Sequence, residues 1–251
     1  MGNSFIQVRR LESQPAAVVL TFARGEKRNA LREADMVALS DRLNALHHDP
    51  ETKVIIITGS GEAFTSGQDV NDINAFEGAQ LARLFERDVD ILSRIVMMPK
   101  LVIAAVNGTS AGFGNHLAIC SDYCVVKRSA AFHFTGIAKS IPSPMLGTLL
   151  LPMTVGLKRA KAIYLRGGKY SPEQALADGF CNAVVEDEQW DQSLEALAAE
   201  FCSRNSQVMA LNKHLLNQAA MDMLGAVKLS GMAGAGLLSA ESKLPTGRVS
   251  N

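Results

Sequence analysis

Two short glycine-containing turns are the segments of this sequence that could do chemistry with their backbone alone. Residues 64–69 (FTSGQD) and 107–114 (NGTSAGFG) each follow an apolar run with the composition of a buried strand. Backbone amides at such a turn, or at a helix N-terminus, point outward and attract negative charge. Two amides that converge on one point would form an oxyanion hole, which stabilises a thioester carbonyl as it becomes an enolate. Most glycine turns after strands, however, only connect elements.

Short apolar runs rich in β-branched residues would position these turns. Residues 54–58 (VIIIT) and 101–106 (LVIAAV) are too apolar for edge strands, so we expect buried, parallel strands. Their alternation with helical segments is typical of βαβ units and predicts an α/β protein. Further strands are expected at residues 6–10 and 16–21, which would pair as a hairpin, and at 123–126 and 132–134.

Helical spacing of apolar residues covers much of the remaining chain. It predicts a helix over residues 31–47 and a second, more charged helix over 75–98, which Pro99 ends. From Leu149 onward the chain is largely helical, and residues 208–240 carry one long helical pattern. We therefore expect a boundary near residue 190, between a core that contains the sheet and a helical C-terminal part.

Composition argues against several classes of function. The 25 Lys and Arg residues balance the 25 Asp and Glu residues, so no global field favours nucleic acid or an acidic membrane. No apolar run is long enough to span a bilayer, and the first residues lack the apolar segment of a secretory signal, so we expect a cytoplasmic protein. The four cysteines form no CxxC pair, and we expect reduced core thiols and no metal site.

Several stretches of the chain resemble the enoyl-CoA hydratase/isomerase (crotonase) superfamily, in order and in spacing. They are residues 27–31 (KRNAL), 54–70 (VIIITGSGEAFTSGQDV), 102–122 (VIAAVNGTSAGFGNHLAICSD) and 171–185 (SPEQALADGFCNAVV). Each stretch alone is weak, but together they are specific. The resemblance implies a β-β-α spiral core over residues 1–190 and a C-terminal helical oligomerisation region over residues 191–251. It also implies an acyl-CoA substrate, no separate cofactor, and a homotrimer or a hexamer.

The resemblance further implies where the site lies. The oxyanion hole would use the backbone amides of Gln68 and Phe113, and the segment Lys27–Arg28, with Ala30, would line the CoA channel. Phe113 stands where the family has glycine, so we expect its ring to narrow the pocket or tilt the amide. Other residues expected near the substrate are Ser66, Gly67, Asp69, which would shape the loop, Gly112 and Ser143.

The acid and base groups depart from the family pattern. Hydratases of the family use two glutamates to position and deprotonate one water, and this sequence has His116 and Gly136 at those positions. A third position, where other branches place a carboxylate, is Pro144, between Ser143 and Met145. The resemblance therefore implies a divergent member without the usual catalytic glutamates. His116 is either a general acid or base, since histidine titrates near neutrality, or a structural residue of its helix.

Other titratable residues lie near the expected pocket. The helix over 75–98 carries charged residues, among them Asp88, that could supply a displaced acid or base, although a solvated charged face fits most of them. His133 is expected to be structural, on the strand face opposite Phe132. Lys213 is a candidate for binding the CoA phosphates.

Three functions remain open from the sequence. An acyl-CoA enzyme that acts through an enolate would catalyse isomerisation, decarboxylation, thioester hydrolysis or C–C cleavage. A catalytically weak or inactive acyl-CoA-binding or assembly member of the family would also fit the empty carboxylate positions. An ordinary hydratase would require that its two glutamates lie elsewhere than at residues 116 and 136.

Overall fold

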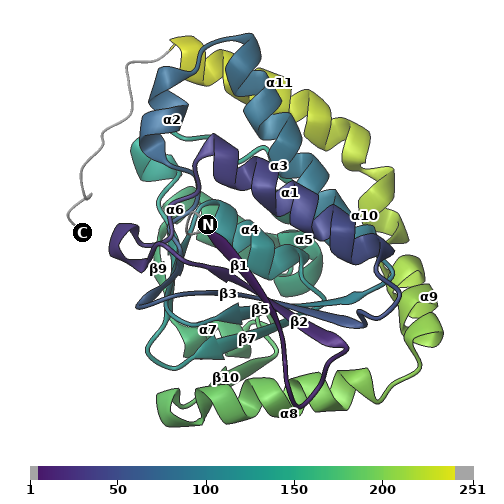
Figure 1. Cartoon of the computed structure of the whole chain (residues 1–251). Helices are drawn as coiled ribbons and strands as arrows, with labels where there is room; N and C mark the ends of the chain where they lie inside the picture. The colour runs from purple at the N-terminus through teal and green to yellow at the C-terminus, as the bar shows by residue number, and fades with distance from the viewer. Residues whose placement is uncertain (1–4, 241–251) are drawn as a thin grey trace.

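The computed structural model describes residues 5–240, with side chains as far as residue 238, and contains two sheets. The larger sheet has the strand order β1 (Ile6–Arg10), β2 (Ala17–Phe22), β3 (Val54–Gly59), β5 (Leu101–Val106), β7 (Tyr123–Lys127) and β10 (Ala183–Val185) (Figure 1). β1 pairs antiparallel with β2, and the other pairs are parallel. The predicted hairpin and the two buried parallel strands are confirmed.

A smaller sheet has the strand order β4 (Ala63–Thr65), β6 (Thr109–Ala111), β8 (Ala131–Phe134) and β9 (Gly168–Tyr170). Each of β3, β5 and β7 is followed along the chain by a strand of this sheet and then by a helix. The two glycine turns therefore occupy equivalent places in successive β-β-α repeats. Because β4 and β6 pair in parallel, the turns that follow them lie next to each other.

Helices cover both faces of the larger sheet (Figure 1). One face carries α1 (Glu33–His48), α3 (Ala79–Met97) and α4 (Phe113–Cys120), and the other face carries α8 (Trp190–Cys202). Alternate residues of β3 divide between the two cores, with Ile55 on the first side and Ile56 on the side of α8. Six further helices are η1 (Gly25–Lys27), η2 (Ile137–Lys139), α5 (Leu146–Val155), α6 (Leu157–Arg166), α7 (Pro172–Ala177) and η3 (Asp187–Gln189).

One predicted helix begins later than expected, and one helical pattern that looked continuous in the sequence is divided. The segment 75–98 contains the end of α2 (Val70–Ala75) and all of α3, with Gly78 at φ 49° immediately before α3. The segment 208–240 comprises parts of α9 (Ser206–Leu216), α10 (Gln218–Asp222) and α11 (Leu224–Ala240), and α11 packs along α3. Among the described helices, none has the length and apolar character required to cross a membrane.

A buried ammonium group joins the C-terminal helices to the rest of the molecule. Lys213 Nζ donates to the carbonyl oxygens of Ile95 and Lys100, at 2.8 and 2.9 Å, and forms an ion pair with Asp122 at 2.7 Å. Only 8% of Lys213 is exposed. The interpretation of Lys213 as a ligand of the CoA phosphates was therefore wrong, because its three donors are already used inside the fold.

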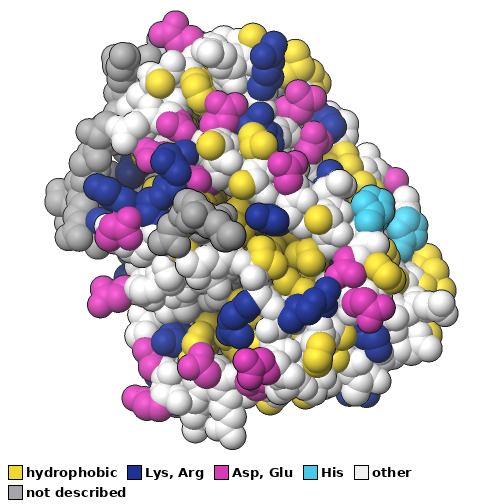
Figure 2. All heavy atoms as spheres, in the orientation of Figure 1, with side chains coloured by type: hydrophobic (Ala, Val, Ile, Leu, Met, Phe, Trp, Pro, Cys, Tyr) yellow, Lys and Arg dark blue, Asp and Glu magenta, His cyan; other side chains and the backbone are white. Residues whose placement is uncertain are grey.

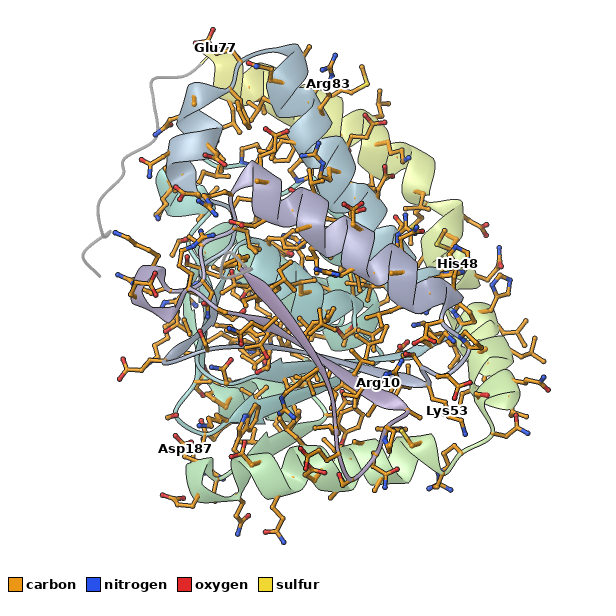
Figure 3. The ribbon with its side chains drawn as sticks, in the orientation of Figure 1. Arg10, His48, Lys53, Glu77, Arg83 and Asp187 are labelled. Carbon is orange, nitrogen blue, oxygen red and sulfur yellow. The ribbon has the colours of Figure 1, made fainter. Side chains whose placement is uncertain are left out.

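The surface mixes charges of both signs. Figure 2 shows acidic and basic side chains interspersed over the face drawn, as expected for a chain with no net charge. Two of the basic side chains labelled in Figure 3 link elements of the fold. Arg10 pairs with Asp49 after α1, and Lys53 Nζ donates to the carbonyl oxygen of Cys202 at 3.3 Å, which fastens α8 to the start of β3.

Candidate active site

The two glycine turns are in direct contact. Gly67 has φ 87° and Gly112 has φ 51°, backbone conformations that favour glycine. A Cβ atom placed on Gly67 would lie 2.9 Å from the carbonyl oxygen of Ala111 and 3.0 Å from the amide nitrogen of Phe113. A side chain at position 67 would therefore force the turns apart.

The backbone amides of Gln68 and Phe113 are both unpaired at this contact. Phe113 is the first residue of α4, so its amide has no acceptor within the helix. Leu31 bonds to the residues on either side of Gln68, at 2.8 Å each, which leaves the Gln68 amide on the opposite side of the chain. Within residues 5–240, neither amide donates to a protein acceptor. Two free donors on touching turns have the arrangement that an oxyanion hole requires.

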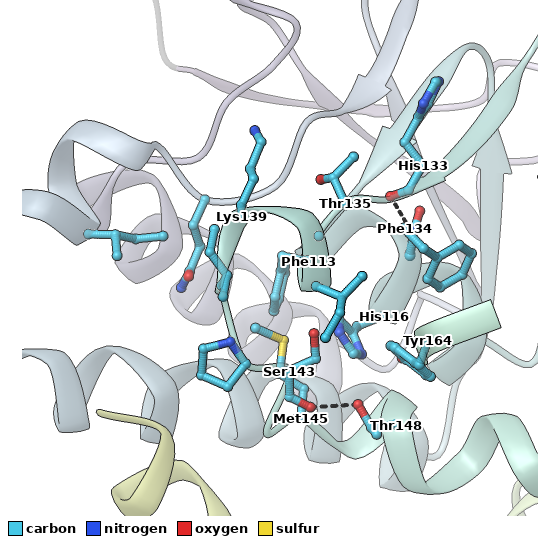
Figure 4. Close-up of a pocket in the computed structure, with 18 of the residues that line it drawn as sticks. Phe113, His116, His133, Phe134, Thr135, Lys139, Ser143, Met145, Thr148 and Tyr164 are labelled. Atoms are coloured by element: carbon cyan, nitrogen blue, oxygen red, sulfur yellow. Dashed lines mark hydrogen bonds between the residues drawn. The ribbon is translucent and has the colours of Figure 1, made fainter. Parts of the chain in front are cut away.

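A cavity of about 290 Å³ lies beside these amides (Figure 4). Six residues predicted from the sequence line it, namely Ser66, Gln68, Gly112, Phe113, His116 and Ser143. Much of the remaining wall is apolar and includes Phe85, Phe134, Ile141 and Met145. Among the described residues, no Asp or Glu contributes to the wall. Such a cavity suits an apolar acyl group with a few polar atoms to orient it.

His116 lies in the first turns of α4 and is only 2% exposed. Its Nδ1 atom is buried without a hydrogen-bond partner among the described residues, and a Cβ at Gly147 of α5 would lie 2.6 Å from it. Burial lowers the pKa of His116 to about 4, so the imidazole is neutral at neutral pH. It can therefore accept a proton, but it titrates well below the neutral range expected from the sequence.

Gly136, which the resemblance places at the second expected glutamate position, lies where a loop packs closely against the backbone. Gly136 lines the cavity, and a Cβ there would lie 2.9 Å from the carbonyl oxygen of Ile141. Further along the loop, the carbonyl oxygen of Ser143 accepts a hydrogen bond from the Thr148 hydroxyl at 2.6 Å, which ties the loop to α5 (Figure 4). A larger side chain at position 136 would need this loop to move.

Asp88 is a buried acid, so the solvated charged face that fits most of the charged residues of this helix does not apply to it. It is 0% exposed, and both carboxylate oxygens accept hydrogen bonds from Gln68 Nε2, at 2.8 and 2.7 Å. Burial raises its pKa well above the usual value. The available signal was its helical spacing, because Leu84 and Leu92 lie four residues away on either side and mark the buried face of α3.

Positive charge gathers where His133 meets the cavity. His133 lines the wall on the strand face opposite the fully buried Phe132, so the predicted alternation is confirmed, although its place in the cavity wall was not expected. Burial lowers the pKa of His133, and the charges of Lys169 and Arg28 lower it further; Lys169 is the register partner of His133 in the β8–β9 pair. Lys139 also lines the cavity.

The remaining predicted binding residues do not line the cavity. Lys27 is exposed in η1. The carbonyl oxygen of Ala30 accepts a hydrogen bond from Arg24 Nη1 at 3.0 Å. The Asp69 carboxylate caps α2 by accepting from the amide of Asn71 at 2.9 Å, a loop-shaping role, and Gly67 allows the close contact between the turns.

Comparison with known proteins supports the resemblance seen in the sequence. The family model described as "Enoyl-CoA hydratase/isomerase" matches residues 12–230. A 1,2-epoxyphenylacetyl-CoA isomerase of Escherichia coli (strain K12) is 31% identical over 215 residues, which cover 84% of this chain and 82% of that protein. A crotonyl-CoA hydratase of Syntrophomonas wolfei is 29% identical over 212 residues, covering 83% of this chain and 80% of that protein.

Solved structures share the fold. The crystal structure of an enoyl-CoA hydratase/isomerase from Mycobacterium paratuberculosis has a TM-score of 0.87 at 24% identity, with 95% of each chain covered. One from Xanthobacter autotrophicus Py2 has a TM-score of 0.85 at 25% identity, covering 95% of this chain and 89% of the other. The chain therefore belongs to the enoyl-CoA hydratase/isomerase family and has its mixed α/β fold.

Proposed function

We propose that this protein is an enzyme that forms an enolate from an acyl-CoA thioester. The contact between Gly67 and the amide of Phe113 carries the proposal, because it brings two unpaired backbone donors to one cavity. Donors placed in this way would hold the thioester oxygen as it gains negative charge. The names of two relatives, a 1,2-epoxyphenylacetyl-CoA isomerase and a crotonyl-CoA hydratase, support a CoA thioester as the substrate.

His116 is the group that we assign to proton transfer. The neutral imidazole removes a proton from the α-carbon, the C–H electron pair forms the C=C bond of the enolate, and the carbonyl electrons move to the oxygen held by the two amides. The imidazolium formed next to this negative charge is stabilised by it, so its pKa rises above the value in the empty cavity. Return of the proton to the γ-carbon of an unsaturated acyl group would complete an isomerisation.

Hydration by a pair of carboxylates is not supported, because no Asp or Glu of the described chain lines the cavity. Each acid or base typically contributes on the order of 100- to 10,000-fold. We therefore expect crotonyl-CoA hydration far slower than that of a homologue with two glutamates. The same observation favours the second candidate function, a family member that binds acyl-CoA with little or no catalysis.

Exchange of the α-protons tests the enolate directly, without knowledge of the natural substrate. Butyryl-CoA incubated with the enzyme in heavy water should gain deuterium at the α-carbon, measured by mass spectrometry. The His116→Gln variant should bind butyryl-CoA with similar affinity but lose exchange by on the order of 100-fold or more. Binding without exchange by the wild type would favour the non-catalytic alternative, and absence of both would contradict the proposal.

The CoA phosphates are assigned to the basic side chains near His133. Arg28 and Lys169 lie close enough to affect the pKa of His133, and Lys27 is the neighbour of Arg28. Arg28→Ala and Lys169→Ala should weaken butyryl-CoA binding but leave butyryl-N-acetylcysteamine, which lacks phosphates, unaffected. Arg204→Ala, which removes an exposed cation just after α8, is the matched control. Equal loss for both thioesters would argue against a role in phosphate binding.

A further inference from the structure

Asp88 is a fully buried acid that does not itself line the cavity. Within the described residues it forms no ion pair, and its side chain accepts hydrogen bonds from Gln68 Nε2 at 2.8 and 2.7 Å. The Gln68 side chain does line the cavity, so it lies between the acid and the site. Asp88 is therefore connected to the cavity through the side-chain amide of Gln68.

Fold stability gives no reason for an acid at this position. Asp88 lies on the buried face of α3, with Leu84 and Leu92 one turn away in either direction. Burying a carboxyl group costs free energy that its hydrogen bonds only partly recover, and a leucine in the same place would avoid that penalty. What distinguishes Asp88 from an apolar residue at this position is that its carboxyl group accepts hydrogen bonds from Gln68.

The two oxyanion turns differ in how their amides are held. Phe113 is the first residue of α4, so the helix fixes the direction of its amide. Gln68 precedes α2, which begins at Val70, and it follows Gly67, whose backbone is free to adopt many conformations. The main chain beside Gln68 is held on one side by Leu31. The side-chain bonds to Asp88 supply the second anchor.

We infer that Asp88 is a positioning residue that holds Gln68, and through it the first amide of the oxyanion hole. This inference rests on the proposed function. It requires the acid to be uncharged while the enolate exists, since a second negative charge behind Gln68 would oppose the first. Burial raises the pKa of Asp88 well above its usual value, which favours the uncharged form that this requirement calls for.

The test separates catalysis from binding in four variants. The α-proton exchange of butyryl-CoA is measured as kcat and KM for Asp88→Leu, Asp88→Asn, Gln68→Met and the double variant Asp88→Leu with Gln68→Met. Asp88→Leu should lower kcat by about 10- to 100-fold with KM nearly unchanged, because a misplaced donor weakens the transition state. Asp88→Asn keeps an acceptor for Gln68 and should restore most of the rate.

The double variant identifies the route of the effect. If Asp88 acts through Gln68, the double variant should be no slower than either single variant, a non-additivity expected of coupled residues. Asp90→Asn, an exposed acid on the same helix, is the control and should retain the wild-type rate. Should Asp88→Leu fail to fold, Gln68→Met carries the same expectation of lower kcat at constant KM.

Three results would overturn the inference. One is a wild-type kcat in Asp88→Leu, which would leave Asp88 with a packing role alone. Another is a double variant whose loss is the product of the single losses. A third is a wild-type kcat in Gln68→Met. Absence of both exchange and butyryl-CoA binding in the wild type would instead overturn the proposed function, and this inference with it.

Discussion

The imidazole of His116 packs against the bare Cα atom of Gly147, so that a Cβ at position 147 would lie 2.6 Å from Nδ1 and 3.2 Å from the His116 Cα atom. Gly147→Ala should therefore push α4 and α5 apart and lower the free energy of unfolding by about 1–3 kcal/mol. Urea denaturation measures this change.

Gly225→Ala is the matched control for a glycine-to-alanine change in a helix. No described atom lies within 4 Å of a Cβ at this position of α11. The change should be neutral or should stabilise by up to about 1 kcal/mol, because alanine favours helix. Similar stability changes in the two variants would show that α4 and α5 tolerate the added methyl group.

The pH dependence of α-proton exchange should reflect the buried state of His116. Because the pKa of His116 is about 4, its imidazole in the free enzyme stays neutral throughout the usual histidine range near pH 6.5. We expect kcat/KM for exchange to stay level as the pH falls through about 6.5, and to decline only near pH 4. A decline centred near 6.5 would show that His116 is more solvated than its surroundings indicate.

His116 should also make the fold sensitive to acid. The unfolded chain binds a proton at this residue near pH 6.5, whereas the folded protein does so only near pH 4, so stability falls as the pH drops between these values. The full loss is about 3 kcal/mol. In urea denaturation, His116→Gln should lack this part of the acid dependence, and an unchanged dependence would contradict the assignment.

Asp88 should have the opposite effect on stability. Since burial raises its pKa, the folded protein holds this proton more tightly than the unfolded chain, whose Asp titrates near pH 4. The stabilisation is present in acid and is lost as the pH rises through the raised pKa. The Asp88→Asn variant, which cannot titrate, should gain stability relative to the wild type as the pH rises. Curves that stay parallel at all pH values would argue against a buried, titrating acid.

Assembly is the remaining prediction. Val208, Leu211 and Leu215 of α9 lie at helical spacing and are each more than half exposed. Such a stripe is typical of a surface that another chain covers, and we expect a trimer or a hexamer. Sedimentation should show Leu211→Glu with Leu215→Glu dissociating, while Gln207→Glu on the same helix does not. A wild-type monomer at micromolar concentration would contradict this.

The sequence predicted the elements that depend on local pattern. Residues 54–58 and 101–106 are strands because short apolar runs that include several β-branched residues suit buried parallel strands, and the turns after them were recognisable by their glycines. The second sheet was missed because β4 and β6 have three residues each, too few to show a period. Gly78, at positive φ, shifts the start of the helix predicted over residues 75–98 to Ala79, which composition alone does not reveal.

Contacts between distant segments were beyond the reach of the sequence. The hydrogen bond from Gln68 to Asp88 connects residues 20 positions apart. Gly147 contacts His116 across two helices, and no rule of residue spacing predicts how those helices pack. The pKa of His116 follows from that packing, so the sequence could suggest a base but not its titration range. Whether the backbone amides of Gln68 and Phe113 are free depends on the hydrogen bonds of the backbone around them, and these form only in the folded chain.

The buried Lys213 ammonium has a consequence for how the molecule comes apart. It bonds to residues 91 to 118 positions earlier in the chain, and its partner Asp122 also accepts from the amide of Val102 at the start of the β5 region. Removal of α9 by proteolysis would leave the buried Asp122 carboxylate without its counter-charge, Lys213. Such a loss typically lowers the free energy of unfolding by about 3–5 kcal/mol. The C-terminal helices should therefore not detach as a separate cooperative unit. Amide hydrogen exchange in α9 should slow to the rate of global unfolding, the same rate that we expect for the buried strand β5.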